Sequence, residues 1–449
     1  MQRGEDPVFF SFGDWTVRPA QRSIERRDER LVLEPRLIDV LTYLAATGGD
    51  VVSAEQLLTD CWRGTFYGDN PVHKTVALLR KALGDHARSP RYIATVRKRG
   101  YQVVAPVTFA DGRRPGSAVR TWNGGSPYRG LLAFGHGDTD VFFGRARATA
   151  DVLAAIHRHH HAGCAFVLLT GPSGCGKSSL VHAGVVPVLV NEAGYDGLRA
   201  VSWSAMASRA PGLAPLESLA VAMTRWEVRG RPVFVETERR DLVHALATDM
   251  DFVVRRIALA VSGQGAAPGD VLLLVIDALE GLLTASATPD DTAVLVSALG
   301  RLARSGHVVV LALCRNDFYP QLMSVPDLLA LKRDGVLYDL AMPGPGEVAQ
   351  MIRLPAQAAG LHFERDASSE RHLDDVLLEA ACRHVGSLPL LQYTLQALYE
   401  SRDATGTLCF AAYLRLGGLE GALGQRAEQV LEGLGANAAA AFPRILHRL

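Results

Sequence analysis

The feature that most constrains this chain is a glycine-rich turn at Gly171–Ser178, which reads Gly-Pro-Ser-Gly-Cys-Gly-Lys-Ser. The turn follows the apolar run Ala165–Thr170 and precedes a helix-like stretch, Ser179–Val190. A buried strand that enters such a turn and leaves it as a helix is the context in which the pattern G-x-x-x-x-G-K-[ST] binds phosphate. Glycines without a Cβ let backbone N–H groups close on phosphate oxygens, and the helix N-terminus adds the positive end of its dipole. An ordinary glycine-rich turn seldom carries both the Gly-Lys-Ser ending and the preceding strand, so we expect a nucleotide site here.

Within this turn, Lys177 is expected to meet the β- and γ-phosphates, and Ser178 is expected to hold magnesium. The predicted ligands are therefore ATP or ADP together with Mg²⁺. The residues of the turn that we expect to contact the nucleotide are Gly171, Pro172, Ser173, Gly174, Cys175, Gly176, Lys177, Ser178 and Ser179.

Composition limits the possible partners and compartments. The formal net charge over 449 residues is zero, so any nucleic-acid site must be a local patch. The length predicts about three domains. Six scattered cysteines without a C-x-x-C pair argue against a zinc site or a disulfide framework and favour a reducing cytosol. No signal peptide is evident, and the longest apolar run, Val271–Ile276, is too short to span a bilayer. We expect a cytoplasmic protein without membrane contact, located at the nucleoid when bound to DNA.

Residues 1–109 are predicted to form a small α+β unit. Apolar alternation predicts short antiparallel strands at 8–12, 15–17 and 31–33. Helical spacing begins at Pro35, a capping box at Ser53 and Gln56 opens a second helix, and Pro71 opens a third, which Gly84 ends. A hairpin is expected next, with strands at 92–96 and 101–104. Three helices followed by a hairpin are the order of a winged helix-turn-helix.

Positive charge is concentrated in the same unit. Between Asp69 and Arg99 eight basic residues face two acidic ones, a net charge of +6. A charged run is usually a solvated face, but this charge falls on the third helix and at the hairpin tip. Those surfaces meet the major groove and the neighbouring phosphates in winged-helix proteins. The pattern therefore predicts double-stranded DNA as a partner.

Three segments, Glu34–Arg36, Leu79–Asp85 and Ile93–Tyr101, resemble the OmpR/PhoB-type winged-helix DNA-binding domain, in the version found at the N-terminus of CadC-like regulators. The resemblance implies that the third helix enters the major groove and the wing enters the adjacent minor groove, often in tandem dimers on direct repeats. Because Leu78 stands where the family commonly has arginine, we expect a different base specificity. The resemblance assigns base contacts to His73, Lys74 and Ala77 and phosphate contacts to Arg80 and Lys81, and the basic wing adds Arg97, Lys98 and Arg99.

Residues 110–126 are rich in glycine, proline, serine and arginine without an apolar period, which predicts a flexible linker. From Pro127 onward, apolar strands alternate with helical patterns, and this alternation predicts a parallel sheet covered on both faces. Besides the strand before the glycine-rich turn, strands are expected at 198–203, 271–276, 308–313 and 336–340.

Acidic and basic residues at the ends of these strands are the catalytic candidates. Asp277 ends its strand at the position of the acid that orders the magnesium water. Glu280 is either the base for the attacking water or a solvated helix-start residue. Arg315 either senses phosphoryl charge or forms an ion pair with Asp317. The cluster His157–His161 is interpreted as a solvated helix end, because adjacent histidines do not share one helical face.

The second part of the chain resembles the STAND class of signal-transduction NTPases, relatives of AAA+ proteins. The resemblance implies that Phe143, Gly144 and Arg145 lie near the adenine and ribose, and that Pro389 packs near the base. It also implies an ATP/ADP switch with slow hydrolysis as a timer. The segments that carry it are Ser126–Leu131, Phe142–Arg145, Asp277–Glu280, Leu313–Tyr319 and Gly386–Gln392.

The predicted fold is multidomain: an α+β winged helix-turn-helix followed by an AAA+-like α/β P-loop NTPase and smaller C-terminal parts. We expect a transcription regulator whose ATP/ADP state, set by an inducer or protein sensor, controls homo-oligomerisation and DNA binding. The alternatives are an AAA+-like DNA-dependent ATPase tethered by its winged helix, and a STAND defence-type sensor. The expected divisions are a DNA-binding domain at 1–109, a linker at 110–126, the NTPase domain at 127–345, a helical subdomain at 346–402 and the start of a winged-helix-like subdomain at 403–449.

Overall fold

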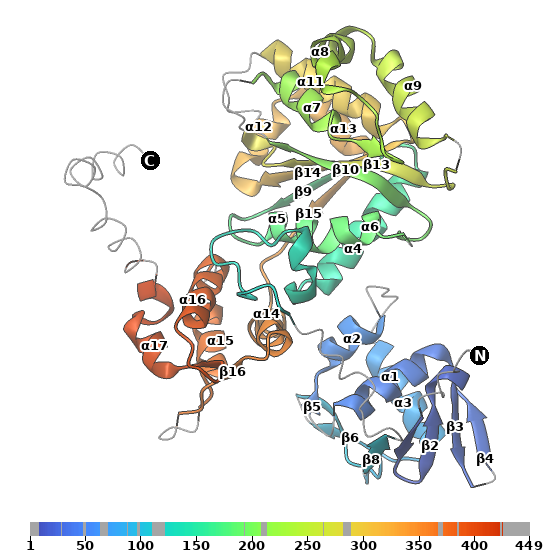
Figure 1. Cartoon of the computed structure of the whole chain (residues 1–449), viewed down its shortest axis with the longest axis vertical. Coiled ribbons are helices and arrows are strands. Elements are labelled where there is room, and N and C mark those ends of the chain that lie inside the picture. Colours follow the sequence, from blue (N-terminus) through green and yellow to red (C-terminus); the bar gives the residue numbers. More distant parts are fainter. Residues whose placement is uncertain are drawn as a thin grey trace. The chain divides into compact units, whose positions relative to one another are not determined.

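The computed structural model divides the chain into two units, Met1–Thr121 and Trp122–Leu449, each of which is described by itself (Figure 1). The residues that the structure describes are 9–424, apart from 28, 48–50, 63–70, 88, 97–98, 110–121, 193, 208–212, 264, 282–288, 367–370, 384–385 and 423. The predicted linker at 110–126 therefore lies mostly outside the described residues.

The first unit begins with an antiparallel sheet whose strand order is β4-β3-β2-β1-β8. Phe10, Phe12 and Trp15 alternate with exposed residues and are buried against the helices, as the period-two pattern predicts. The sheet is larger than expected from the sequence because β3 and β8 were not predicted. Its strands are β1 (Phe10–Phe12), β2 (Trp15–Arg18), β3 (Ser23–Arg26), β4 (Glu29–Val32) and β8 (Val107–Phe109).

Three helices and a second sheet complete the unit and confirm the winged-helix order. Ser53 and Gln56 form the predicted capping box: the Gln56 N–H donates to Ser53 Oγ at 3.0 Å, and the Ser53 N–H donates to Gln56 Oε1 at 2.8 Å. The short helix Pro19–Gln21 (η1) joins β2 to β3. The remaining elements are α1 (Pro35–Ala46), β5 (Val51–Val52), α2 (Ala54–Trp62), α3 (Pro71–Leu83), β6 (Ile93–Val96) and β7 (Gly100–Val103), with sheet order β5-β7-β6.

A buried carboxylate joins α3 to the hairpin. Asp85 follows Gly84, which ends α3 in the left-handed conformation with φ 68°. The Asp85 side chain is 6% exposed and accepts hydrogen bonds from the backbone N–H groups of Arg91 at 2.7 Å and Ile93 at 2.9 Å. It also accepts the N–H groups of His86 and Tyr92. Because one carboxylate satisfies four donors, the start of β6 is fixed relative to the third helix.

The second unit is built on a five-stranded sheet in which every pairing is parallel. The four strands predicted after the glycine-rich turn are confirmed, and the order is β10-β13-β14-β9-β15. β14 thus lies between the strand that leads into the turn and the strand that ends in Asp277. The strands are β9 (Phe166–Gly171), β10 (Arg199–Ala207), β13 (Asp270–Asp277), β14 (Val308–Arg315) and β15 (Val336–Asp339).

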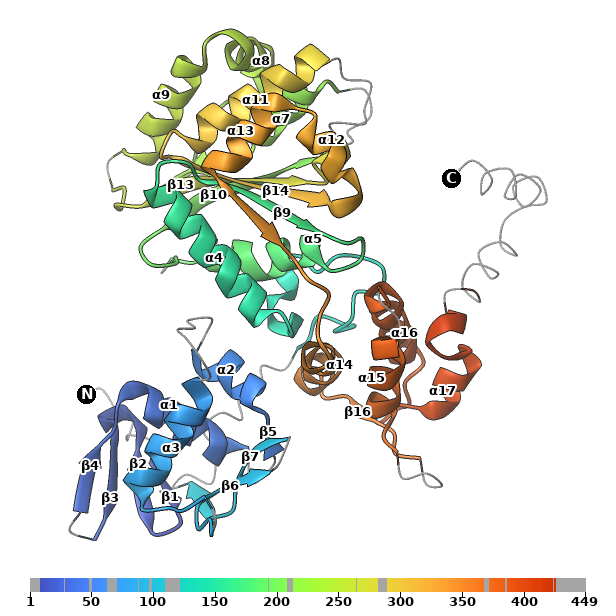
Figure 2. The same ribbon diagram turned by 180° about the vertical axis from the view of Figure 1, so that it is seen from behind.

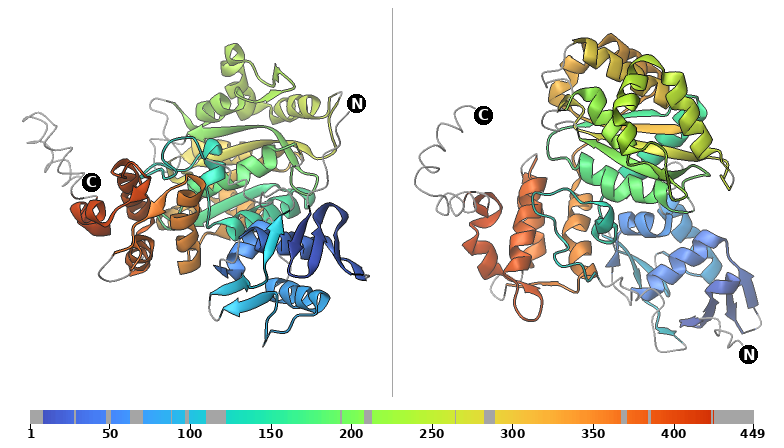
Figure 3. Two further views of the ribbon diagram at one scale, coloured as in Figure 1. Left: turned by 60° about the horizontal axis from the view of Figure 1, so that its bottom comes forward. Right: turned by 45° about the horizontal axis from the view of Figure 1, so that its top comes forward.

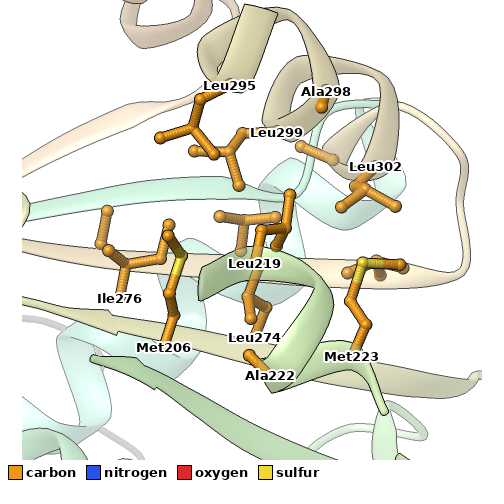
Figure 4. Packing of buried hydrophobic residues seen from close by; sticks show 14 of the residues in the cluster. Met206, Leu219, Ala222, Met223, Leu274, Ile276, Leu295, Ala298, Leu299 and Leu302 are labelled. Carbon is orange, nitrogen blue, oxygen red and sulfur yellow. The ribbon is translucent and has the colours of Figure 1, made fainter. Parts of the chain in front are cut away.

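Helices cover both faces of this sheet, as the uninterrupted apolar strands predict (Figures 2 and 3). Leu274 and Ile276 pack with Leu219 and Leu299 on one face (Figure 4), while Leu273 and Val275 pack with Val185 on the other. The first face carries α7 (Pro215–Met223), α8 (Arg239–Thr248), α9 (Met250–Val261), α11 (Pro289–Ala303), α12 (Tyr319–Met323) and α13 (Pro326–Asp334). The second face carries α4 (Ala146–His161) and the helix after the glycine-rich turn, which consists of α5 (Lys177–Ser179), a π-helical stretch η3 (Leu180–Val185) and α6 (Val186–Val190). A small hairpin, β11 (Glu227–Val228) and β12 (Arg231–Pro232), and the short helices η2 (His136–Val141), η4 (Glu236–Glu238) and η5 (Asn316–Phe318) connect these elements.

A group of helices follows the sheet. Leu408 and Leu419 lie in the same apolar core as Ile352 and Leu395, so the described part of 403–424 packs with the predicted helical subdomain; the boundary at 402/403 stays a prediction, and 425–449 lie outside the described residues. The elements are α14 (Pro345–Ala358), β16 (His362–Phe363), α15 (Leu373–Arg383), α16 (Leu388–Glu400), β17 (Thr407–Leu408) and α17 (Phe410–Arg415). Among the described helices, none combines the length and apolar character needed to cross a bilayer.

Candidate functional site

A cavity of about 320 Å³ lies at the carboxyl end of the sheet in the second unit. Its walls come from the glycine-rich turn, the ends of β13 and β14, residues 130–145, α14 and α16. We call residues 126–145 the lead segment. Of the predicted nucleotide and catalytic residues, those that line the cavity are Phe143, Arg145, Ser173, Gly174, Gly176, Lys177, Ser178, Ser179, Asp277, Glu280, Arg315 and Pro389. Gly144, Gly171, Pro172 and Cys175 lie beside it, in the backbone that shapes it.

The parallel sheet explains why distant residues meet here. The carboxyl ends of parallel strands lie at one edge of a sheet, so the turn after β9, Asp277 on β13 and Arg315 on β14 are brought together. Gly174, with φ 75°, approaches α16 so closely that an added Cβ would lie 2.8 Å from Pro389 Cγ. Only a residue without a side chain permits this approach.

Lys177 folds back over its own turn. Its Nζ donates to the carbonyl oxygens of Gly171 at 2.8 Å and Pro172 at 2.9 Å. Both acceptors are uncharged, whereas hydrogen bonds to charged phosphate oxygens are shorter and about twice as strong. The Lys177 ammonium is thus held at the turn, where phosphate oxygens can replace the two carbonyl oxygens as its hydrogen-bond acceptors.

Ser178 and Asp277 supply a pair of hard oxygen donors. Ser178 Oγ donates to Asp277 Oδ1 at 3.1 Å, and His182 Nε2 lies 3.5 Å from Asp277 Oδ2. Burial by itself raises the pKa of the Asp277 carboxyl, but the contacts with His182 and Ser178 and the charge of Lys177 outweigh burial and bring this pKa below its usual value. The carboxylate is therefore ionised, which suits a divalent cation with oxygen ligands such as Mg²⁺.

Glu280 and Arg315 line the same cavity from the carboxyl ends of two neighbouring parallel strands, β13 and β14. Glu280 is only 9% exposed, so it is not a solvated helix-start residue, and its Oε2 accepts the backbone N–H of Arg315 at 3.4 Å. The Arg315 guanidinium pairs with Asp317, which confirms the ion pair. A role for Arg315 in sensing phosphoryl charge stays a prediction, as does a catalytic role for Glu280. Ala278 stands between the two acids with φ 69°, a conformation that disfavours a residue with a Cβ.

The lead segment joins the glycine-rich turn to α14. Arg145 is 4% exposed; it donates to the Cys175 carbonyl oxygen at 2.6 Å and lies 3.8 Å from the Glu347 carboxylate on α14. A Cβ on Gly144 would lie 2.4 Å from the Glu347 carbonyl oxygen. Ser179 accepts the N–H of Phe134 at 3.1 Å. The proximity of Phe143, Gly144 and Arg145 to a nucleoside stays a prediction, while the contacts of Gly144 and Arg145 connect two walls of the cavity.

Two residues of this site were not foreseen from the sequence, His182 and Glu347. His182 stands four residues after Ser178, a helical spacing that places the two side chains on the same face, so this signal was present. Glu347 reaches the site only through the packing of α14, which no local pattern reports. The two cysteines nearest the cavity are poor nucleophiles, because burial raises the pKa of the Cys175 thiol and raises that of Cys314 to about 12.

In the first unit, α3 presents one face to its own core and the other to solvent. Its buried stripe is Val72, Thr75, Val76, Leu79 and Leu83. The exposed face contains His73, Lys74, Ala77, Leu78 and Lys81. These side chains are therefore accessible to a partner that lies along the helix.

Two residues of α3 contact the hairpin. Arg80 donates from Nε and Nη2 to the Ile93 carbonyl oxygen at 3.2 and 2.8 Å, and from Nη2 to Thr95 Oγ1 at 2.8 Å. His73 Nδ1 contacts the Tyr101 hydroxyl. The Arg80 guanidinium thus already has partners within the unit. In the hairpin tip, Arg99 is exposed, while Arg97 and Lys98 lie outside the described residues.

Comparison with known proteins identifies two families along the chain. The family profile described as Novel STAND NTPase 1 matches residues 127–449, and the profile described as Transcriptional regulatory protein, C terminal, matches residues 28–103. The chain is 42% identical to the transcriptional activator CadC of Escherichia coli K12 over 98 residues, which are 22% of this chain and 19% of CadC. It therefore spans about a fifth of the length of that relative.

Solved structures match each unit in turn. The DNA-binding domain of E. coli CadC is 38% identical, covers 24% of this chain and 99% of that domain, and has a TM-score of 0.22. The ORC1 protein of Aeropyrum pernix in complex with DNA is 12% identical, covers 68% of this chain and 72% of that protein, and has a TM-score of 0.42.

Proposed function

Since the chain belongs to the Novel STAND NTPase 1 family and its first unit is an OmpR/PhoB-type winged helix, we propose that it is a transcription regulator. Its affinity for DNA is switched by a bound nucleotide. ATP or ADP occupies the cavity at the carboxyl end of the sheet. The observation that carries this proposal is the Lys177 side chain, which is held by two uncharged carbonyl oxygens at a turn built for phosphate.

Each side chain around the cavity has a role in this proposal. Backbone N–H groups of the glycine-rich turn bind the phosphates, and Lys177 exchanges its carbonyl partners for phosphate oxygens. Ser178 would hold Mg²⁺ and Asp277 would order a water on it; the ion neutralises phosphate charge when bound. Glu280 orients or deprotonates the attacking water from its buried position, and Arg315 must leave Asp317 to reach a phosphoryl group. The last requirement favours slow hydrolysis.

The lead segment and α14 link the nucleotide to the rest of the chain. Arg145 contacts both the glycine-rich turn, through the Cys175 carbonyl, and α14, through Glu347. Tyr128 of the lead segment donates from its hydroxyl to the Ile352 carbonyl on the same helix at 2.7 Å. A nucleotide that reshapes the turn therefore acts on a segment that is continuous in sequence with the first unit. In this scheme ADP holds a closed monomer, and ATP with an inducer releases it to form oligomers.

On the DNA side, the exposed face of α3 lies in the major groove. His73, Lys74 and Ala77 face bases, and Lys81 with the wing residues Arg97, Lys98 and Arg99 faces phosphates. Arg80 contributes to phosphate binding with whatever part of its guanidinium the hairpin leaves available. Clustering of several winged helices on repeated half-sites raises affinity through effective concentration, without any new base contact.

The test is to measure particle mass and duplex affinity on the same full-length sample, first with ADP and then with a non-hydrolysable ATP analogue. Assembly and tight DNA binding only with the ATP analogue are the expected result. If the nucleotide changes neither quantity, the switch is refuted. Rapid turnover that DNA stimulates, without a change in mass, would instead identify a tethered DNA-dependent ATPase. A DNA-independent oligomer would favour a defence-type sensor.

A further inference from the structure

His182 contacts the acid of the cavity and has no role in the proposed chemistry above. It lies in the π-helical stretch η3, one turn beyond Ser178 on the helix that follows the glycine-rich turn. Its Nε2 lies 3.5 Å from Asp277 Oδ2, and its side chain is 18% exposed. π-Helical stretches within α-helices are rare and occur frequently at functional sites. The π-helical geometry therefore occurs at His182, the residue that contacts the Asp277 carboxylate.

The two oxygens of Asp277 have different neighbours. Oδ1 lies 3.1 Å from Ser178 Oγ, while Oδ2 faces His182. Ser178, which would hold the cation, and Asp277, which would order a water on it, thus already lie side by side. Without a partner for Oδ2, the carboxylate could rotate about its terminal torsion, which is broad for aspartate.

The ring of His182 is itself held in place. Trp203, on β10, lies against it with ring centroids 5.8 Å apart and an interplanar angle of 50°. Trp203 also stacks with His136 of the lead segment, at a centroid distance of 6.5 Å and an interplanar angle of 11°. Packing against an aromatic ring restricts the torsions of the imidazole, so Nε2 stays directed toward the carboxylate.

We propose that His182 is a positioning residue that fixes the Asp277 carboxylate, so that Oδ1 remains beside Ser178 for a divalent cation. This inference rests on the proposed nucleotide site and extends it to the cation. The imidazole faces Oδ2 through Nε2 at 3.5 Å and does not line the cavity itself. Orientation of a ligating or metal-ordering group by an outer partner typically changes metal affinity 10- to 100-fold.

The experiment measures ADP affinity of the full-length chain by calorimetry, in excess Mg²⁺ and in EDTA. The ratio of the two dissociation constants reports the cation alone, because Lys177 and the backbone of the turn bind phosphate in both conditions. His182→Leu, which removes the donor and keeps an apolar side chain against Trp203, is expected to reduce this ratio about tenfold while the affinity in EDTA stays within twofold. His182→Gln, which restores an N–H donor, is expected to recover most of the ratio.

His157→Gln is the matched control, because His157 lies on α4 and contacts Tyr195 and His161 instead of the cavity. It should leave both affinities unchanged. An unaltered ratio in His182→Leu overturns the inference, and so does an equal loss in Mg²⁺ and in EDTA, which would mean that His182 only supports the helix. A wild-type chain that binds no ADP under either condition refutes the nucleotide site itself. Binding that Mg²⁺ does not affect refutes only the cation assignment.

Discussion

The two recognition surfaces of this chain are prepared in opposite ways. The exposed face of α3 presents Lys74 and Lys81 outward from a closed apolar core, so a partner would add contacts to a surface that is already formed. In the cavity of the second unit, Lys177 and Ser178 already bind other groups of the protein. A ligand there must exchange contacts instead of adding them. A preformed surface such as the α3 face suits a binding affinity that stays constant. A site that exchanges its contacts, such as the cavity, suits a switch controlled by its ligand.

Among the variants that test this comparison, Lys177→Ala is expected to have the largest effect. If the cavity exchanges neutral contacts for phosphate contacts, removal of the ammonium should weaken nucleotide binding about 100-fold or more, since hydrogen bonds to charged groups are worth roughly 1.5–3 kcal/mol each. Titration with a fluorescent ADP analogue measures the loss. Lys332→Ala is the control, because Lys332 lies on α13 over the Tyr319 ring. Undiminished binding in Lys177→Ala would contradict the phosphate-site assignment.

Asp85→Ala tests how much the buried carboxylate contributes to the stability of the first unit. The substitution leaves four backbone N–H groups near Tyr92 and Ile93 without their carboxylate acceptor, and we expect the free energy of unfolding of this unit to fall by about 2–3 kcal/mol. Hydrogen exchange at the Tyr92 and Ile93 amides measures the change. Exchange at β9 and β13 should not change; an equal increase there would mean that the two units unfold together.

Comparing Lys81→Ala with Arg80→Ala distinguishes a cation that is exposed on α3 from one whose guanidinium is hydrogen-bonded to the hairpin. Lys81→Ala should weaken DNA binding several-fold and reduce the slope of log affinity against log salt by about 1, because one phosphate contact is lost. Arg80 is bonded to Ile93 and Thr95, so Arg80→Ala should reduce thermal stability as well as affinity. Equal salt slopes and equal melting temperatures in the two variants would remove this distinction.

The smallest expected effect concerns the backbone beside the catalytic candidates. Ala278 has φ 69°, a conformation that costs roughly 1–2 kcal/mol for a residue with a Cβ. Ala278→Gly should therefore stabilise the second unit by about 1 kcal/mol, and Ala278→Val should destabilise it. Thermal unfolding of the two variants measures the difference. A lower melting temperature for Ala278→Gly would show that its greater unfolded-state entropy outweighs the relieved strain.

The sequence predicted those parts of the fold whose signals are local. The Ser53–Gln56 capping box, the Pro71 helix start and the glycine-rich turn each depend on residues within a few positions of one another. Strand β3 was missed because its residues, Ser23–Arg26, are mostly polar and do not alternate clearly. Strand β8 was missed because its identity depends on pairing with β1, about a hundred residues earlier.

The same limit applies to the site. Lys177 and Ser178 follow from one continuous motif, whereas the contact between Ser178 and Asp277 joins residues 99 positions apart. Both residues were predicted, but their separation was not, since it depends on how far β14 spaces β9 from β13. Arg80 is a second example of this limit. Its charge was visible in the sequence, but the direction of its guanidinium depends on where the hairpin packs.

The close approaches at Gly144 and Gly174 have a consequence for genetics. At Gly144 the backbone lies against Glu347 on α14, and at Gly174 it lies against Pro389 on α16. One methyl group at either position would push a helix away from the segment that it packs against, α14 from the lead segment at Gly144 and α16 from the glycine-rich turn at Gly174. If the proposed switch operates, a selection for mutants that no longer respond to their signal should therefore enrich alanine at these two codons, which belong to the second unit and not to the unit that carries the DNA-binding candidates.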